Sequence, residues 1–293
     1  MIVSVAGGND EQLNWGARME YNIRQLSFGE VLDRSLRILI ENPVLLIGVS
    51  LVLGLPAAML QHAGKVAGGT LAVIYLLLVS PLVLAALTSA IADTYLNKPV
   101  TIASAYQEAW SIVLPFIGTY LLLYLILGLI FGGIFGLAFA SGMAVRGSGG
   151  GGAVFVLLFL VSFVILSYLG IRWSLIGPIM IVERRFAMKA LSRSSELVTG
   201  AWWRTFGILL VAGLIVRVPL SVLELFWASI PVLGGILSGL VASIAAAYSG
   251  IAVVVYYFDR RCRLEDFDLR RLAEQIRSET VQGTAAISGA PSV

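Results

Sequence analysis

Six long apolar stretches constrain the fold of this 293-residue chain more than any other feature of its sequence. Each has about 18 residues or more, enough for a helix to cross a hydrocarbon layer about 30 Å thick. Apolar residues make up 58% of the chain and charged residues only 13%, which is well outside the usage of soluble globular domains. The sequence therefore predicts an all-α polytopic membrane protein with six transmembrane helices, at about 43–61, 70–92, 113–141, 153–182, 206–228 and 231–257.

A short amphipathic segment that carries charged residues precedes each pair of apolar stretches, so one pattern recurs three times. The three segments are LSFGEVLDRSLRIL (26–39), TIASAYQEAWSIV (101–113) and FAMKALSRSSELV (186–198). The pattern predicts three tandem units, each with one interfacial amphipathic helix and two spans. These helices either lie in the plane of the membrane interface or pack on the ends of the spans as a collar, and the sequence leaves both arrangements open.

The ends of the amphipathic segments carry recognisable signals. Ser27 followed by Glu30 forms a capping box, which predicts the start of the first helix. A residue before proline is biased away from helical backbone, and glycine commonly follows a helix. The three segments are therefore predicted to end in breaks at Asn42-Pro43, Leu114-Pro115 and Thr199-Gly200.

Basic residues indicate the orientation of the chain in the membrane. Lys and Arg gather in the N-terminal segment, in the 183–205 loop and after the last span, whereas the opposite loops contain only Lys65 and Arg146. The positive-inside rule then places both termini in the cytoplasm, as an even number of spans requires. The predicted location is the plasma membrane.

The predicted organisation has three parts. Residues 1–25 are expected to form a flexible N-terminal tail, and residues 26–260 the membrane domain. Residues 261–293 are expected to form a basic cytoplasmic tail, in which a short helix is followed by disorder.

The basic residues also indicate which partners to expect. They are spread along one face of the membrane, where each contributes about 1 kcal/mol of attraction to anionic head groups. We expect membrane lipids, with anionic head groups at the inner leaflet, as partners, and no nucleic acid. Glycines four residues apart, in the ladders Gly128–Gly136 and Gly235–Gly239, allow helices to approach closely. Packing within the chain is the expected use, and a homo-oligomer or another membrane protein is the alternative.

Residues suited to catalysis or metal binding are scarce. His62 is the single histidine, and no nucleophile and carboxylate accompany it locally. Cys262 is the single cysteine, which excludes an intramolecular disulfide and a thiolate metal cluster. We therefore expect no cofactor and no enzymatic activity, and an enzyme that acts on lipid is only a distant possibility.

Charged residues inside the predicted spans are the most informative polar positions. An arginine at the centre of a bilayer costs about 2.5–3.5 kcal/mol on insertion scales, so Arg172 and Arg217 are expected to face protein, water or a partner. Glu224 lies seven residues after Arg217 on the same helical face and is a candidate partner for it. One interpretation is a polar pocket or conduction path for an anion. The other is that the arginines bond to backbone carbonyls freed near Pro178 and Pro219.

The segment RWSLIGPIMIVERRFAMKALSRSSELVTGAWWRTFGILL (172–210) resembles the membrane domain found fused to bacterial glycerophosphodiester phosphodiesterases. The positions that carry the resemblance are Arg172-Trp173, Pro178, Glu183, Ala190-Leu191, Arg193-Ser194, Leu197, Gly200, Trp203 and Arg204. The resemblance covers about residues 26–275. It implies a six-span bacterial inner-membrane protein without phosphodiesterase activity, because the catalytic barrel of the fused proteins is a separate soluble domain.

Within this resemblance, Arg172, Glu183, Arg193 and Arg204 are expected to form a structural network near the cytoplasmic ends of the fourth and fifth spans. If the network is structural, Arg172→Ala should lower thermal stability in detergent.

Two functional hypotheses follow. The first is a scaffold or lipid-environment factor without catalytic activity. The second is a small transporter or channel with a midplane site for an anion or a lipid head group, lined by Arg172 and Arg217. A water-accessible cavity at both arginines would favour transport, and a dry site with satisfied carbonyls would favour a scaffold. Two-span units that keep the same orientation differ from the inverted repeats of many transporters, which favours the scaffold.

Overall fold

The computed structural model describes residues 24–62, 67–96, 98–144, 151–227, 230 and 233–266. The helices are α2 (Phe28–Glu41), α3 (Pro43–His62), α4 (Ala67–Tyr95), α5 (Ile102–Ala144), α6 (Gly151–Arg172), α7 (Ile176–Pro178), the π-helix η1 (Ile179–Glu183), α8 (Met188–Val198), α9 (Trp202–Trp227) and α10 (Leu233–Glu265). No strand occurs in these ranges. The all-α prediction is confirmed.

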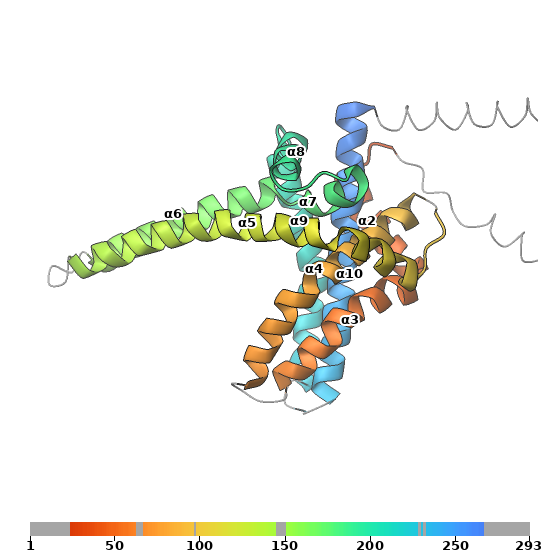
Figure 1. The fold of residues 1–293 in the computed structure, drawn as a ribbon, viewed down its shortest axis with the longest axis horizontal. Helices are drawn as coiled ribbons and strands as arrows, with labels where there is room; N and C mark the ends of the chain where they lie inside the picture. The colour runs from red at the N-terminus through yellow and green to blue at the C-terminus, as the bar shows by residue number, and fades with distance from the viewer. Residues whose placement is uncertain are drawn as a thin grey trace, which may run out of the picture.

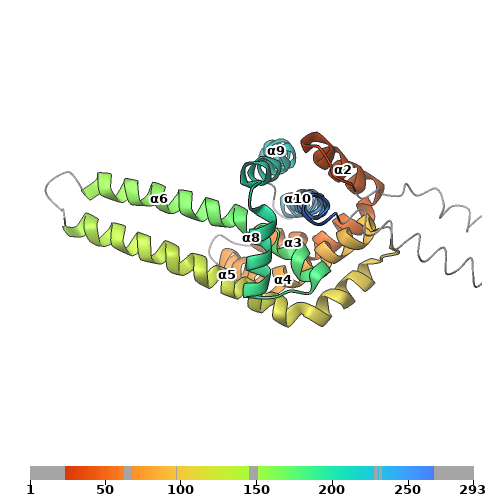
Figure 2. The same cartoon turned by 90° about the horizontal axis from the view of Figure 1, so that it is seen from above.

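Helix α10 is the centre of the molecule. Seen from above, it lies among α2, α3, α4 and α9 (Figure 2). From its middle onward it carries four of the largest fully buried side chains of the core, namely Tyr248, Tyr256, Tyr257 and Phe258. Because aromatic side chains bury the largest apolar area per residue, this half of α10 is the main contributor to the core. We call α3, α4, α9 and α10 the bundle.

Glycine residues bring α3 close to the first half of α10. A Cβ atom on Gly239 would lie 2.7 Å from the Cα of Leu55, and one on Gly54 would lie 2.8 Å from the carbonyl oxygen of Gly239. These backbones approach so closely that only glycine fits. For Gly239 the expectation of packing within the chain is therefore confirmed. By contrast, added Cβ atoms on Gly128, Gly132 and Gly136 would meet nothing within 4 Å.

Helices α5 and α6 form an antiparallel hairpin that projects sideways from the bundle (Figures 1 and 2). We call its projecting part, residues 115–144 and 151–172, the apolar arm. Its surface carries exposed leucine and phenylalanine side chains, such as Leu129 and Phe139. Exposed apolar surface of this extent is typical of contact with lipid or with another protein rather than with water.

Among the described residues, four segments are long and apolar enough to cross a membrane, namely Ile102–Ala140, Ala153–Glu183, Trp202–Trp227 and Leu233–Glu265. A fifth is added if α2 and the start of α3, bent by 87° at the break between them, are counted as one span. The helices therefore fit a multi-pass membrane protein with four or five candidate spans. Six spans in three tandem units remain a prediction.

Two of the three predicted helix breaks are found, and the prediction of the third is wrong. Helix α2 ends at Asn42, whose side chain and backbone N–H both donate to the carbonyl oxygen of Ile38. Gly200, with φ of 78°, turns the chain between α8 and α9. At Leu114-Pro115, however, α5 continues without interruption. Proline is tolerated within apolar helices of this kind where side chains, neighbouring helices or small local adjustments satisfy the carbonyl that loses its N–H donor.

The start of α2 follows the sequence closely. The Ser27 side chain accepts from the backbone N–H of Glu30 at 3.3 Å, and the Glu30 carboxylate accepts from the backbone N–H of Ser27 at 2.6 Å. The predicted capping box is confirmed. At the other end of the chain, α10 runs through residue 260 to Glu265. The rest of the predicted C-terminal tail, from residue 267, and the predicted N-terminal tail up to residue 23 lie outside the described residues.

Candidate functional site

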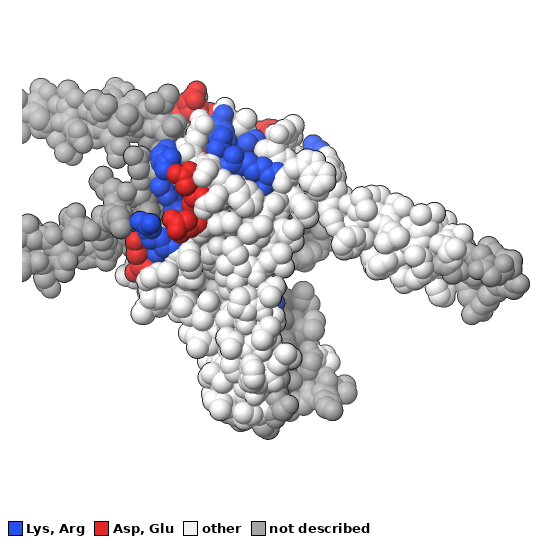
Figure 3. Space-filling view, turned by 180° about the vertical axis from the view of Figure 1, so that it is seen from behind, with Lys and Arg blue, Asp and Glu red and all other residues white. Residues whose placement is uncertain are grey.

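The charged side chains gather at one end of the bundle. We call this region, residues 24–37, 183–204 and 257–265, the charged cap. Blue and red surface is concentrated there, whereas the lower bundle and the apolar arm are almost entirely uncharged on the face shown (Figure 3). Of the six residues singled out in the sequence, three belong to the charged cap, namely Glu183, Arg193 and Arg204.

The cap is built around a break in helical structure after α6. The helix ends at Arg172, and three residues in turn conformation precede α7. The buried hydroxyl of Ser194 on α8 donates to the carbonyl oxygen of Arg172 at 2.9 Å and accepts from the backbone N–H of Leu175 at 3.3 Å. One side chain thus satisfies a donor and an acceptor that the break releases, which would otherwise be costly to bury.

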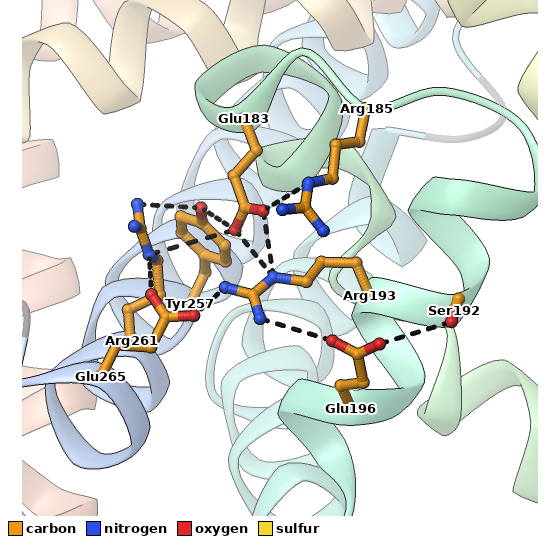
Figure 4. A network of polar contacts seen from close by, with 8 residues as sticks. All are labelled: Glu183, Arg185, Ser192, Arg193, Glu196, Tyr257, Arg261 and Glu265. Atoms are coloured by element: carbon orange, nitrogen blue, oxygen red, sulfur yellow. Dashed lines mark hydrogen bonds and ion pairs between the residues drawn. The ribbon is translucent and has the colours of Figure 1, made fainter.

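The π-helix η1 then delivers Glu183 to the centre of a polar network (Figure 4). Its carboxylate accepts from Nε of Arg193 at 3.0 and 3.2 Å and from the hydroxyl of Tyr257 at 2.9 Å. Nε of Arg185 lies 3.3 Å and Nε of Arg261 4.0 Å from its oxygens. Partners from the loop before α8, from α8 itself and from α10 therefore converge on one carboxylate.

Arg193 links this carboxylate to a second one. Its guanidinium also pairs with Glu265 on α10 and lies 3.5 Å from Glu196. Burial opposes the charged form of Arg193, but Glu265 and Glu183 outweigh it and raise its pKa above the ordinary value. Arg261 donates from Nε to Glu265 at 2.9 Å. These are charge-assisted hydrogen bonds, which are stronger than neutral ones.

A second network surrounds Asp259, whose side chain is fully buried on α10. It accepts from the backbone N–H of Leu26 at 2.7 Å, from Nη2 of Arg204 at 3.1 Å and from Nε of Arg263 at 3.0 Å. Arg204 and Arg263 each also donate to the carbonyl oxygen of Leu26 at 2.6 Å. The network therefore ties the segment before α2 to α9 and α10.

Buried Arg260 completes the cap by satisfying the end of α8. It donates from Nε to the carbonyl oxygen of Leu197 at 2.8 Å, and its Nη2 lies 3.5 Å from that of Thr199. Cationic side chains at a helix C-terminus complement its unpaired carbonyls. The neighbouring Glu108 on α5 pairs with Arg184 at 2.6 Å and accepts from the hydroxyl of Ser89.

The six residues singled out in the sequence are therefore only partly brought together. Glu183 and Arg193 pair directly, and Arg204 belongs to the Asp259 network. Arg172 joins through its carbonyl, while its guanidinium donates to the hydroxyl of Tyr168 at 3.0 Å. Arg172 also lies in the last turn of α6 rather than in the middle of a continuous helix.

Arg217 and Glu224 lie elsewhere. Arg217 is exposed on α9 and Glu224 is partly buried on the same helix. Within the described ranges, no ion pair joins them. Neither residue lies in the charged cap as defined above, and neither Arg172 nor Arg217 lines the two clefts that are described below for the described part of the chain.

The sequence did not point to four residues of the charged cap. These are Ser194 as a partner of backbone groups, and Asp259, Arg260 and Glu265. A signal for some of them was present. In FDRRCRLE, Asp259 precedes Arg263 by four residues and Arg261 precedes Glu265 by four, which is the spacing of ion pairs on one helical face. The partner Leu26 carries no such signal, because it is 233 residues from Asp259 along the chain.

The chemistry available in the cap is that of fixed ion pairs. Each carboxylate of the two networks pairs with at least one arginine. In the described part of the chain, no three histidine, cysteine or carboxylate side chains are grouped to hold a metal ion. Cys262 is buried.

Two clefts on the described part of the surface lie near the charged cap and the apolar arm. One lies in the charged cap beside the start of α8. The other has a volume of about 250 Å³ and lies between α4 and α5, where the apolar arm leaves the bundle. It is lined by Ser80, Pro81, Leu84, Ile117, Tyr120, Leu121 and Tyr124, and its surface is mostly apolar.

Comparison with known proteins places the chain in a family. No curated protein and no solved structure matches it. A family model described as a domain of unknown function (DUF8558) matches residues 69–280. The matched range includes the helix break, the Glu183 network and Asp259, but not Leu26. The resemblance to the membrane domain of glycerophosphodiester phosphodiesterases stays a hypothesis. The chain belongs to the DUF8558 family.

Proposed function

We propose that the chain is an integral membrane protein without catalytic activity, which acts as a scaffold or lipid-environment factor. In this proposal the charged cap lies at the inner leaflet of a bacterial plasma membrane, with both termini in the cytoplasm. The concentration of basic residues in the N-terminal segment, in the 183–205 loop and at the end of α10 supports this orientation.

One observation carries the proposal: the polar groups at the helix break and in the two networks are satisfied by side chains of the protein itself. Ser194 satisfies the two backbone groups at the break, and Glu183 and Asp259 are each held by two or more donors. In transporters with broken helices, such groups are instead directed at substrate or ion. A break that is filled by the protein's own side chain favours a structural role.

The rival hypothesis, a small transporter or channel, needs Arg172 and Arg217 to line one site. The guanidinium of Arg172 is bonded to Tyr168, and Arg217 is on the outer surface of α9. Neither of the two clefts described above is lined by them. The geometry therefore supports the scaffold better than a midplane anion site.

A flux assay on the full chain tests the proposal. Purified protein is reconstituted into vesicles loaded with phosphate or acetate, the small anions that two arginines would attract, and efflux is compared with that from protein-free vesicles. We expect no difference. Efflux that disappears in Arg217→Ala while thermal stability is kept would establish the transporter instead.

A second measurement tests the proposed role in the lipid environment. The protein is extracted from membranes together with its surrounding lipid in a polymer nanodisc, and the lipid composition is compared with that of the whole membrane. We expect enrichment of anionic phospholipids. A composition equal to that of the whole membrane would contradict a role in organising the lipid environment.

A further inference from the structure

The cleft in the charged cap has the composition of an anion site. Its volume is about 810 Å³, and it is lined by Arg184, Arg185, Phe186, Ala187, Met188, Lys189, Ser192 and Glu196. These residues come from the loop after η1 and from α8 as far as Glu196, so a single short segment lines the cleft. Three of the side chains are cationic and one is a carboxylate.

The carboxylates nearby leave most of this positive charge available. Glu108 and Glu183 each hold one edge of a guanidinium, through Nη2 of Arg184 at 2.6 Å and Nε of Arg185 at 3.3 Å. The remaining N–H groups of both guanidinium groups are available to a ligand. Lys189 makes no ion pair or hydrogen bond within the described chain.

The carboxylate that lines the cleft is partly neutralised. Nη1 of Arg193 lies 3.5 Å from Glu196, and the hydroxyl of Ser192 donates to the same side chain at 3.4 Å. The start of α8 adds to the positive potential, because Ala187 at its N-cap supplies no side-chain acceptor for the first N–H groups of the helix. The cleft therefore favours an anion with several oxygens.

The apolar neighbours of these cations identify the source of the anion. Met188 is 61% exposed in the first turn of α8, directly beside Lys189, and Phe186 lines the same cleft. The cap also lies where the apolar helices end (Figure 3). At a membrane interface, an exposed apolar side chain beside cations matches a ligand that is anionic at its head and apolar below it.

We propose that this cleft binds the phosphate of an anionic phospholipid, with Arg184, Arg185 and Lys189 around the phosphate and Met188 beside the first part of an acyl chain. The site rests on the proposed function and deepens it by naming the lipid class and the residues. Guanidinium groups match phosphate oxygens in pairs, whereas Lys189 acts as a point charge.

Native mass spectrometry of the full chain in neutral detergent tests the site. Phosphatidylglycerol is titrated against wild type, Lys189→Gln and the matched control Lys98→Gln, which removes the same charge elsewhere on the protein. We expect Lys189→Gln to weaken binding about fivefold, because a lysine near an anionic head group contributes about 1 kcal/mol. Lys98→Gln should bind as wild type does, and phosphatidylcholine should bind more weakly than phosphatidylglycerol to both.

Equal affinity of wild type and Lys189→Gln for phosphatidylglycerol would overturn the proposal. The same is true if phosphatidylcholine binds equally well. Both variants change exposed residues, so thermal denaturation should show unaltered folding.

Two further arms separate a lipid from free phosphate. Met188→Ser should weaken phosphatidylglycerol binding and leave the thermal shift produced by inorganic phosphate unchanged. If inorganic phosphate displaces phosphatidylglycerol at equal concentration and Met188→Ser has no effect, the ligand is a free phosphate and the lipid assignment is wrong.

The two proposals fail separately. Anion efflux in the vesicle assay would contradict the scaffold function even if the cleft selects phosphatidylglycerol. Loss of selectivity at the cleft without efflux would overturn the lipid site alone.

Discussion

At the scale of single residues, Ser194 has the most specific structural role. Its hydroxyl satisfies one donor and one acceptor at the break after α6, and it is fully buried. A buried polar group that loses its partner costs about 1–3 kcal/mol. The residue therefore stabilises a break that would otherwise expose backbone groups to an apolar environment.

We expect Ser194→Ala to lower the unfolding free energy by about 2 kcal/mol, because two backbone groups lose their partner. Thermal denaturation in detergent, followed by tryptophan fluorescence, measures the change. Ser195→Ala is the matched control, since the Ser195 hydroxyl makes no hydrogen bond within the described residues and the variant should melt as wild type does. Equal melting temperatures for the two variants would contradict the role of Ser194.

Arg172 and Arg193, two of the three arginines that were grouped in the sequence, should behave differently. Arg193 is mostly buried between Glu183 and Glu265, and Arg193→Ala removes its charge-assisted hydrogen bonds to both. Because the carboxylates keep Tyr257 and Arg261 as partners, the expected cost is about 1.5–3 kcal/mol. Arg172→Ala removes one hydrogen bond to Tyr168 and should cost about 1 kcal/mol. Thermal denaturation of the two variants side by side gives the comparison, and a larger loss for Arg172→Ala would be the opposite result.

At the scale of helices, the contact of α3 with α10 depends on the absence of side chains. The backbones meet at Gly54 and Gly239, where a Cβ atom has no room. The second glycine ladder, on α5, has open space around it. The same spacing of glycines thus has two different structural settings.

Gly239→Ala should destabilise the bundle by about 1–3 kcal/mol, because the new methyl group overlaps the backbone of α3. Gly132→Ala is the matched control on the apolar arm, where alanine favours the helix over glycine by about 0.5–1 kcal/mol. Melting temperatures should therefore move in opposite directions. A loss of stability in Gly132→Ala would indicate that another chain or another part of this one covers that ladder.

The helices were more predictable than the way they meet. Apolar runs and the Ser27–Glu30 capping box are local signals, so the all-α fold and the start of α2 follow from them. The break at 172–175 has no proline or glycine within it, and Pro115 does not break α5, because tertiary partners rather than local preference decide both. The partners of Glu183 and Asp259 come from distant segments, and a single sequence carries no direct signal for such contacts.

At the scale of the whole molecule, the charged cap and the far end of the bundle should lie on opposite sides of the membrane. In a variant whose buried Cys262 is replaced by alanine, single cysteines are introduced at Lys98 and at Ile230. Lys98 pairs with Asp93, which lies within electrostatic reach of Arg184 in the charged cap, whereas Ile230 lies between α9 and α10 at the far end of the bundle (Figure 1). A membrane-impermeant maleimide should label Ile230→Cys in intact cells. It should label Lys98→Cys only after the membrane is opened, and labelling of both from one side would contradict the proposed orientation.

The sideways direction of the apolar arm has a further consequence for the surrounding bilayer. From Pro115 to Ala144, α5 has a length of about 45 Å, whereas the hydrocarbon layer is about 30 Å thick. A helix with surplus length can cross obliquely, and α10 at about 50 Å has the same surplus. The apolar arm and the bundle diverge from one cap. Both fit a single flat layer when they lean away from the membrane normal in opposite directions. Such a splayed protein occupies a wider area in the leaflet opposite the cap than beside it, which favours membrane that curves toward the cap.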